Sequence, residues 1–134
     1  MKYSELTRRY FESATRAGTL PDAFRGAAGQ RDQGTWVQFD VQINAAAIAD
    51  ARFLAFGCPH TLAVAAWLAE TSIGTPLRRD MPESAAALRE RFAVPVEKLG
   101  RLLIVEDAWR AALSAAIDSA APAPMSGERR VKDA

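Results

Sequence analysis

The sequence has very little cysteine and histidine, the two residue types that most often bind zinc in proteins. Among its 134 residues there is one cysteine, Cys58, and one histidine, His60. A single cysteine cannot form a disulfide within the chain, so nothing favours an oxidising compartment. No apolar run approaches the roughly 20 residues of a membrane-spanning helix, and the first five residues lack the apolar segment of a signal peptide. We therefore expect a cytoplasmic protein without a membrane partner.

The sequence also lacks a bias of charge. Lysine and arginine nearly balance aspartate and glutamate, which leaves a net charge of +1, and both signs are mixed along the chain. This balance gives no reason to expect nucleic acid as a partner. Apolar residues make up 49% of the chain and charged residues 25%, so a packed core is expected. The length suits one domain, which we place at residues 1–121, followed by a mobile tail over 122–134.

The clearest local pattern is an alternation of apolar and polar residues over 36–44. A period of two places one set of side chains on a core and the other set in water, as in a half-buried antiparallel strand. The apolar set is Val37, Phe39, Val41 and Ile43. A second run with the same period covers 48–56 after a short connection, so the two segments are predicted to form a β-hairpin.

Apolar residues at helical spacing flank this hairpin on both sides. The predicted helices cover 4–16, 59–73, 83–92 and 95–120. Pro59 suits the first turn of its helix, and Gly74 suits the end. Residues 19–34 contain several glycines and polar residues and are interpreted as irregular, with room for a short edge strand near 23–28. This order of elements predicts an α+β domain with a small antiparallel sheet and the helices on one face.

The sequence contains no local motif of a known enzyme class. It has no Walker loop, no GxGxxG turn and no HExxH helix. The neighbouring carboxylates Glu106 and Asp107 lie side by side in a predicted helix and therefore point apart, which favours a solvated surface over acid–base chemistry. We therefore expect that the protein is not an enzyme.

Cys58 and His60 are the candidates for chemistry. Cys58 lies between a predicted strand end and a helix start, where the helix N-terminus stabilises the thiolate, the reactive and metal-binding form of cysteine. A half-buried structural cysteine is the alternative interpretation. His60 is interpreted as a solvent-facing or helix-capping residue. It is only a weak second candidate for a metal ligand, because structural zinc usually takes four ligands and Cys58 and His60 supply two. A thiol enzyme built on both residues is the least favoured interpretation, since no supporting residues accompany them.

One segment carries a family resemblance. Residues 50–58 read Asp-Ala-Arg-Phe-Leu-Ala-Phe-Gly-Cys. This block resembles the D-A-R-F-x-T/A-F/Y-G-C signature of the iron–sulfur cluster assembly scaffolds of the IscU/NifU N-terminal family. Residues 106–112 are similar to the E-D-A-I/V-K/R-A-A helix of the same family, and residues 3–18 are similar to its first helix. The similar segments follow in the same order over about residues 3–118, which implies an IscU/NifU-like fold.

The resemblance also implies which positions would hold metal. In these scaffolds three cysteines, helped by an aspartate or a histidine, hold a nascent iron–sulfur cluster or zinc. Cys58 matches the middle cysteine. Gln33 and Thr35 stand where the family has its first cysteine and the aspartate, with Gly34 retained between them, and Arg101 stands where it has its third cysteine. The resemblance thus implies a cluster or zinc as cofactor, while the ligand set of this chain leaves open that it binds neither.

Two functions follow from the resemblance. The first is an iron–sulfur cluster assembly scaffold-like protein with most cluster ligands lost, which acts through Cys58. It would either bridge a cluster in a homodimer or accept sulfur from a cysteine desulfurase. The second is an interaction module that docks on that desulfurase or another cluster-assembly partner without binding metal. In both cases we expect the isolated monomer to bind neither zinc nor a cluster tightly, because Arg101 brings positive charge to a former ligand position.

Overall fold

The computed structural model describes residues 3–13 and 16–120. The predicted tail over 122–134 and two residues of the first predicted helix lie outside this range, so the domain boundary at residue 121 stays a prediction. The elements follow in the order α1 (Glu5–Ser13), β1 (Phe24–Gln30), η1 (Arg31–Gln33), β2 (Thr35–Asn44), β3 (Ala47–Phe56), α2 (Pro59–Ser72), α3 (Ala85–Arg91), η2 (Val96–Lys98) and α4 (Leu99–Ala120). Here η marks a short 3₁₀ helix.

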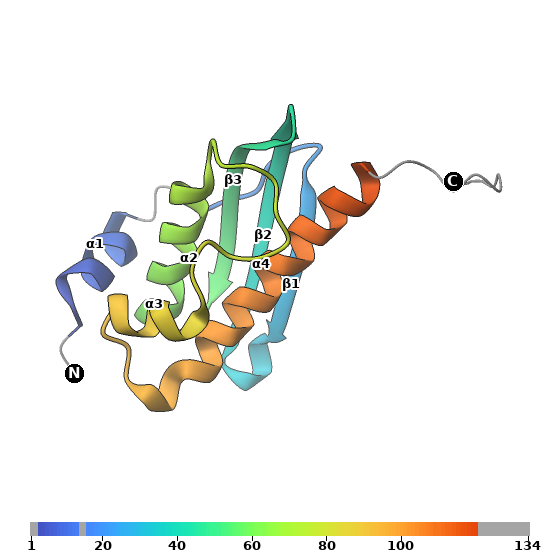
Figure 1. Ribbon diagram of the computed structural model, residues 1–134. Helices are drawn as coiled ribbons and strands as arrows, with labels where there is room; N and C mark the ends of the chain where they lie inside the picture. Colours follow the sequence, from blue (N-terminus) through green and yellow to red (C-terminus); the bar gives the residue numbers. More distant parts are fainter. Residues whose placement is uncertain (1–2, 14–15, 121–134) are drawn as a thin grey trace.

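The three strands form one antiparallel sheet in the order β1-β2-β3. The helices lie on one face of this sheet (Figure 1). There α4 crosses β1 and β2, α2 packs on β3, and α1 packs on the outer side of α2. The predicted α+β class, with a small antiparallel sheet covered on one face, is therefore confirmed. None of the helices within the described ranges is long and apolar enough to cross a bilayer.

The core lies between the sheet and its helices, as the period-two pattern predicts. Val37, Phe39 and Val41 on β2 are completely buried. The ring of Phe39 meets the edge of Trp109 from α4, with the ring centroids 5.0 Å apart. Burial of an aliphatic or aromatic side chain of this size stabilises the fold by about 1.5–3 kcal/mol. The predicted hairpin is confirmed, and its two strands each begin one residue earlier than expected.

The edge strand β1 is longer and more regular than the sequence suggests. Residues 24–30 pair with β2 along their whole length, so the short edge strand allowed near 23–28 is confirmed, and the irregular backbone expected at Gly29 and Gln30 is wrong. The strand forms because α4 presses directly on it. A Cβ atom at Gly26 would lie 2.1 Å from the backbone nitrogen of Ala112. Only glycine permits this approach, and the close contact fixes a segment whose own strand propensity is low.

The predicted helix boundaries are close to the observed ones. The second helix begins at Pro59 and ends at Ser72, just before Gly74, which takes a positive φ of 87°. The third helix starts two residues later than predicted, because Ser84 is its N-cap and accepts a hydrogen bond from Ala87 at 3.1 Å. The long last helix starts with the 3₁₀ turn η2 and continues as α4 from Leu99.

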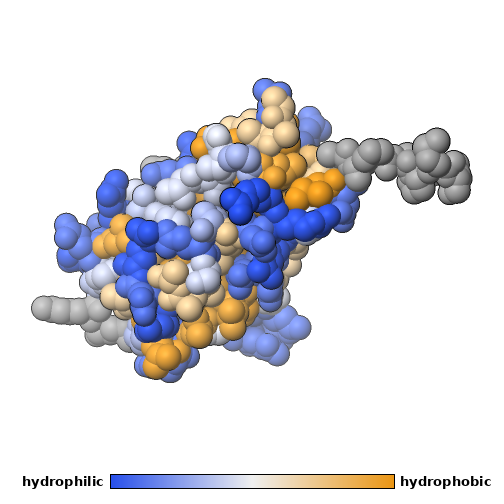
Figure 2. All heavy atoms as spheres, in the orientation of Figure 1, coloured by the Kyte–Doolittle hydropathy of each residue, from blue (hydrophilic) through white to orange (hydrophobic). Residues whose placement is uncertain are grey.

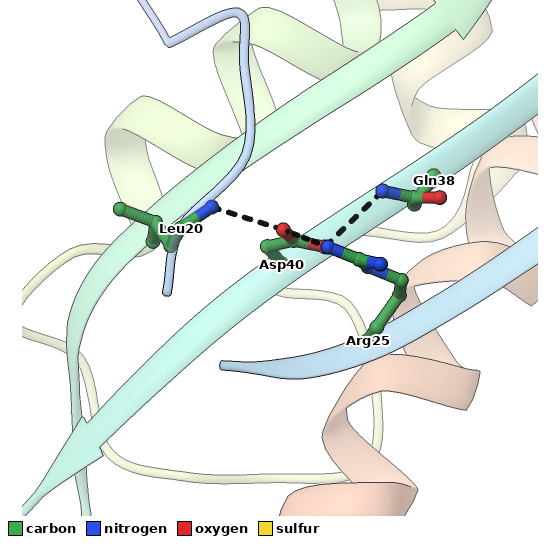
Figure 3. Close-up of polar contacts among 4 residues, drawn as sticks. All are labelled: Leu20, Arg25, Gln38 and Asp40. Atoms are coloured by element: carbon green, nitrogen blue, oxygen red, sulfur yellow. Dashed lines mark hydrogen bonds and ion pairs between the residues drawn. The ribbon is translucent and has the colours of Figure 1, made fainter. Parts of the chain in front are cut away.

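On the face of the sheet away from the helices, a buried carboxylate pairs with a half-exposed arginine. The side chain of Asp40 is 0% exposed. Its two oxygens accept hydrogen bonds from the Arg25 guanidinium at 2.8 and 2.9 Å and from the backbone N–H of Leu20 at 3.0 Å (Figure 3). Gln38 donates a further bond at 3.3 Å. Burial would raise the pKa of Asp40, but these donors outweigh it and lower the pKa below its usual value.

Candidate functional site

The candidate site lies at one end of the sheet, where the chain turns from β3 into α2. Cys58 is the N-cap of α2, with φ −79° and ψ 168°, and its thiol is half-buried. β2 begins at this same end, because Trp36 pairs with Phe56. The sequence dictates the turn locally: Gly57 ends the strand, and Pro59 takes the first helical position, where its missing N–H costs nothing.

The surroundings of Cys58 favour its thiolate. Burial alone would raise the pKa of the thiol. The backbone N–H and the hydroxyl of Thr61 counter this effect, and the Sγ of Cys58 lies 3.6 Å from that hydroxyl. The Arg101 side chain and the backbone N–H of His60 add to it, so the pKa of Cys58 lies below its ordinary value. A cysteine at a helix N-terminus beside a cation is the usual setting of a reactive thiol.

Arg101 has a second role that sequence reasoning missed. From the sequence it is only a positive charge at a former ligand position. In the structure it reaches Cys58 from the first turn of α4 and stabilises the thiolate. The family resemblance already implied that Arg101 lies at the same site as Cys58, but it did not show that Arg101 lowers the pKa of the thiol. Thr61, in contrast, had a signal, since the third residue of a helix is within reach of its N-cap side chain.

The other two family positions contribute no donor to Cys58. Gln33 is exposed at the end of the η1 turn, and Thr35 is buried at the start of β2. Neither takes part in the hydrogen bonds that stabilise the thiolate. Of the positions that the family resemblance implies as ligands, Arg101 acts on Cys58, whereas Gln33 and Thr35 do not appear among the groups that lower its pKa.

The expectation that His60 faces solvent or caps the helix is wrong. His60 is 1% exposed, and its ring packs edge-on against Tyr3 with the centroids 4.8 Å apart. Burial lowers the pKa of His60, and the positive charges of Lys98 and Arg101 lower it further, so the imidazole is neutral at pH 7. Its Nδ1 has no hydrogen-bond partner among the described residues. The helical register turns position 60 toward the core, which the two-residue spacing from Cys58 could not show.

The donors at this end of the sheet do not fit a protein-bound cluster. Within residues 3–13 and 16–120 there is no group of three or more histidine, cysteine, aspartate or glutamate side chains that could hold a metal ion. Zinc and iron–sulfur clusters usually take four protein ligands or nearly so. Cys58 offers one thiolate, and Arg101 places a cation beside it. The arrangement is suited to a nucleophilic thiolate that forms one covalent bond or supplies one ligand.

Comparison with known proteins agrees with this fold. The family model described as the NifU-like N terminal domain matches residues 2–118. The chain is 26% identical over 118 residues to the iron–sulfur cluster assembly scaffold protein IscU of Azotobacter vinelandii, a match that covers 84% of this chain and 92% of that protein.

Two solved structures share the architecture. One is a protein from Fervidobacterium islandicum described as an iron–sulfur cluster assembly scaffold for the SUF system, with a TM-score of 0.68 and 16% identity over 83% of this chain and 96% of the other. The second is the N-terminal part of a nitrogen-fixing NifU-like protein from Brucella abortus, with a TM-score of 0.69 and 16% identity over 88% and 95%. At such low identity these likenesses concern the fold alone.

Proposed function

The chain belongs to the NifU-like N terminal domain family, a family of iron–sulfur cluster assembly scaffolds, and we propose that it serves cluster assembly as a sulfur acceptor through the single thiol of Cys58. The observation that supports this role is the lowered pKa of a half-buried cysteine. The thiolate, and not the thiol, is the nucleophile in sulfur transfer. Scaffolds of this family work with cysteine desulfurases in general, and such an enzyme is the proposed sulfur donor.

The transfer step is a thiol–persulfide exchange. A desulfurase carries the sulfur as the terminal atom of a cysteine persulfide. The Cys58 thiolate attacks that terminal sulfur, the sulfur–sulfur bond of the donor breaks, and the desulfurase cysteine leaves as a thiolate. Cys58 then carries the persulfide, with no net oxidation or reduction. Arg101 and the N–H groups at the start of α2 stabilise the anion before and after the exchange. A reducing compartment such as the cytoplasm suits this role, since the thiol must stay reduced.

The role of a complete cluster scaffold has less support than that of an acceptor. One thiolate per chain leaves a cluster short of protein ligands, and the neighbouring guanidinium disfavours a cation at the same place. A homodimer could pair two Cys58 thiolates and, with two further ligands, reach four. The acceptor role requires no such partner, because one sulfur atom forms one bond to one thiolate.

Sulfur transfer is tested with a bacterial cysteine desulfurase, L-cysteine and the reduced protein under anaerobic conditions. We expect intact-mass measurement to show one added sulfur atom per chain, and the Cys58→Ala variant to gain none. The Arg101→Gln variant should gain sulfur more slowly, because its thiol is less ionised at pH 7. If the desulfurase binds the chain and Cys58 gains no sulfur, the proposal is wrong and the chain is a docking module.

Metal binding is tested separately, with zinc or with ferrous iron and sulfide under reducing conditions, followed by desalting. We expect far less than one metal per chain on the monomer, since four ligands are normally required. A result near one equivalent on a verified monomer would contradict the loss of the scaffold site. About half an equivalent on a dimer, abolished by Cys58→Ala, would support a bridged cluster in place of simple sulfur acceptance.

A further inference from the structure

A second concavity lies far from Cys58, at the other end of α2. It has a volume of about 320 Å³ and is enclosed by α2, α4, the start of β3 and the segment over 74–83 that follows α2. Figure 1 shows this segment crossing in front of the sheet between the two helices. Trp67 and Thr71, which line the cavity, are nine and thirteen residues from Cys58, which is about 14 and 20 Å along the helix axis. The cavity is therefore separate from the thiol site.

The rim of this cavity is fixed by contacts on both sides. The backbone of Thr75 accepts a hydrogen bond from Ile48 at 2.9 Å, and Gly74 donates to Ile48 at 2.7 Å. On the other side, Asp80 forms an ion pair with Arg110 of α4 at 3.1 Å. A rim held to both the hairpin and α4 leaves the cavity formed before any ligand arrives, which lowers the entropic cost of binding.

The walls are mainly apolar and aromatic. Trp67 of α2 and Trp109 of α4 both line the cavity, together with Ile48 and Leu113. On the face drawn in Figure 2, residues of intermediate hydropathy lie among strongly hydrophilic ones over these helices. Indole rings bind flat aromatic groups well, through burial and ring contacts. Pockets for small ligands run from about 300 to 1,000 Å³, so this one fits a ligand with a single ring.

The charged side chains on the rim favour a ligand with a negative charge. Three charged side chains line the cavity: Arg78, Asp80 and Glu83. The two carboxylates are already engaged, since Asp80 pairs with Arg110 and Glu83 accepts both hydrogen bonds of Arg91. Arg78 is exposed and forms no ion pair with another described residue. Its guanidinium is thus the one rim charge left to meet a ligand, and guanidinium groups match carboxylates in shape and charge.

We infer that this cavity binds a small aromatic carboxylate, with the ring against Trp67 and the carboxylate at Arg78. The inference does not depend on Cys58 or on the sulfur-acceptor role. Binding there would give the protein a ligand site that is distinct from its thiol chemistry.

The test uses 3-phenylpropionate as the probe and its neutral amide, 3-phenylpropionamide, as the matched control. Titration of the full chain is followed through the indole N–H signals of its tryptophans by NMR. We expect saturable shifts at Trp67 and Trp109, a Kd on the order of 0.1–1 mM for the acid, and binding at least about fivefold weaker for the amide. Trp36 on the other face of the sheet should not move.

Two variants separate the ligand charge from general effects. Arg78→Gln should lower the affinity for the acid to that for the amide, and it should leave the affinity for the amide unchanged. Only the acid can form an ion pair with the guanidinium. Arg79→Gln is the control, since Arg79 pairs with Asp118 and does not line the cavity. Both sites are exposed, so dispersed amide spectra should confirm that each variant folds. Equal affinity for acid and amide, an unchanged acid affinity in Arg78→Gln, or shifts confined to Trp36 would overturn the inference.

Discussion

Asp40 and Cys58 each have a pKa below the ordinary value although burial alone would raise it, and the fold surrounds the two groups differently. Asp40 is completely buried, and donors within the fold occupy both of its oxygens (Figure 3). Cys58 is half-buried, and its hydrogen bond to a side chain is a long one, 3.6 Å from Sγ to the hydroxyl of Thr61.

The difference lies in what is left for another molecule. Both oxygens of the Asp40 carboxylate accept hydrogen bonds from the protein itself. The role of this charge is therefore structural: it links β1, β2 and the segment before β1. The sulfur of Cys58 is half-buried, and the helix N-terminus and Arg101 lower its pKa, so part of its surface is left for a second molecule. A lowered pKa alone therefore does not identify a functional group, whereas a lowered pKa with open coordination does.

The largest expected effect is the loss of stability on changing Asp40, whose oxygens are occupied by donors within the fold. Asp40→Asn keeps the size of the side chain but removes the charge that holds the two-bond contact with Arg25. We expect a loss of about 3 kcal/mol in the free energy of unfolding, because hydrogen bonds to a buried charge are among the stronger ones. Urea denaturation followed by circular dichroism measures this loss at pH 7.

The exposed ion pair between Arg79 and Asp118 provides the control. Asp118→Asn should cost less than about 0.5 kcal/mol, since solvent screens the pair. The pH dependence adds a second check. Because the pKa of Asp40 is lowered in the folded protein, its contribution is present above the unfolded-state value near 3.9 and is lost as the pH falls through the folded-state value. The difference in the free energy of unfolding between wild type and Asp40→Asn should therefore become smaller at acid pH. A difference that persists there would show that packing, not charge, was lost.

The intermediate effect is on the reactivity of Cys58. Arg101→Gln removes one of the groups that lower the pKa of the thiol. The pKa should rise toward the ordinary value, and alkylation by iodoacetamide at pH 7 should slow about threefold to tenfold, because the thiolate fraction falls. The full pH–rate profile measures both the pKa and the limiting rate.

Lys98→Gln is the matched control for this change. Lys98 and Arg101 both lower the pKa of His60, and Arg101 also lowers the pKa of Cys58. The control should raise the pKa of the imidazole, as followed by NMR, and leave the alkylation profile unchanged. Equal slowing by the two variants would mean that general positive potential, and not contact with Arg101, sets the pKa of the thiol.

The smallest expected effect is the stability change on removing the thiol. Cys58→Ser should change the free energy of unfolding by less than about 1 kcal/mol at pH 6, since the sulfur makes one weak contact. The folded-state pKa is lowered, so the thiolate stabilises the fold only as the pH rises through that value toward the unfolded value near 8.5. The loss should thus be greater at pH 9 than at pH 6. A loss at pH 6 as large as that of Asp40→Asn would indicate a structural cysteine.

The sequence alone determined the parts of the fold that depend on short-range patterns. The alternation around Phe39 fixed the hairpin, because a strand has a period of two and one of its faces is buried. Gly57, Pro59 and Gly74 fixed the limits of α2, because each has backbone preferences of its own. The block over 50–58 also indicated the family, and it placed Cys58 where a helix begins.

The tertiary structure alone decided which distant groups meet. The strand β1 depends on the close approach of α4 to Gly26, which no pattern within residues 24–30 signals. His60 is buried against Tyr3, and Arg101 reaches Cys58, through the packing of three separate segments. Local propensity acts over a few residues, whereas electrostatic contact acts through space and depends on how the elements pack. The sequence could therefore locate the thiol and, through the family resemblance, place Arg101 at the same site, but only the fold could show that Arg101 lowers the pKa of Cys58.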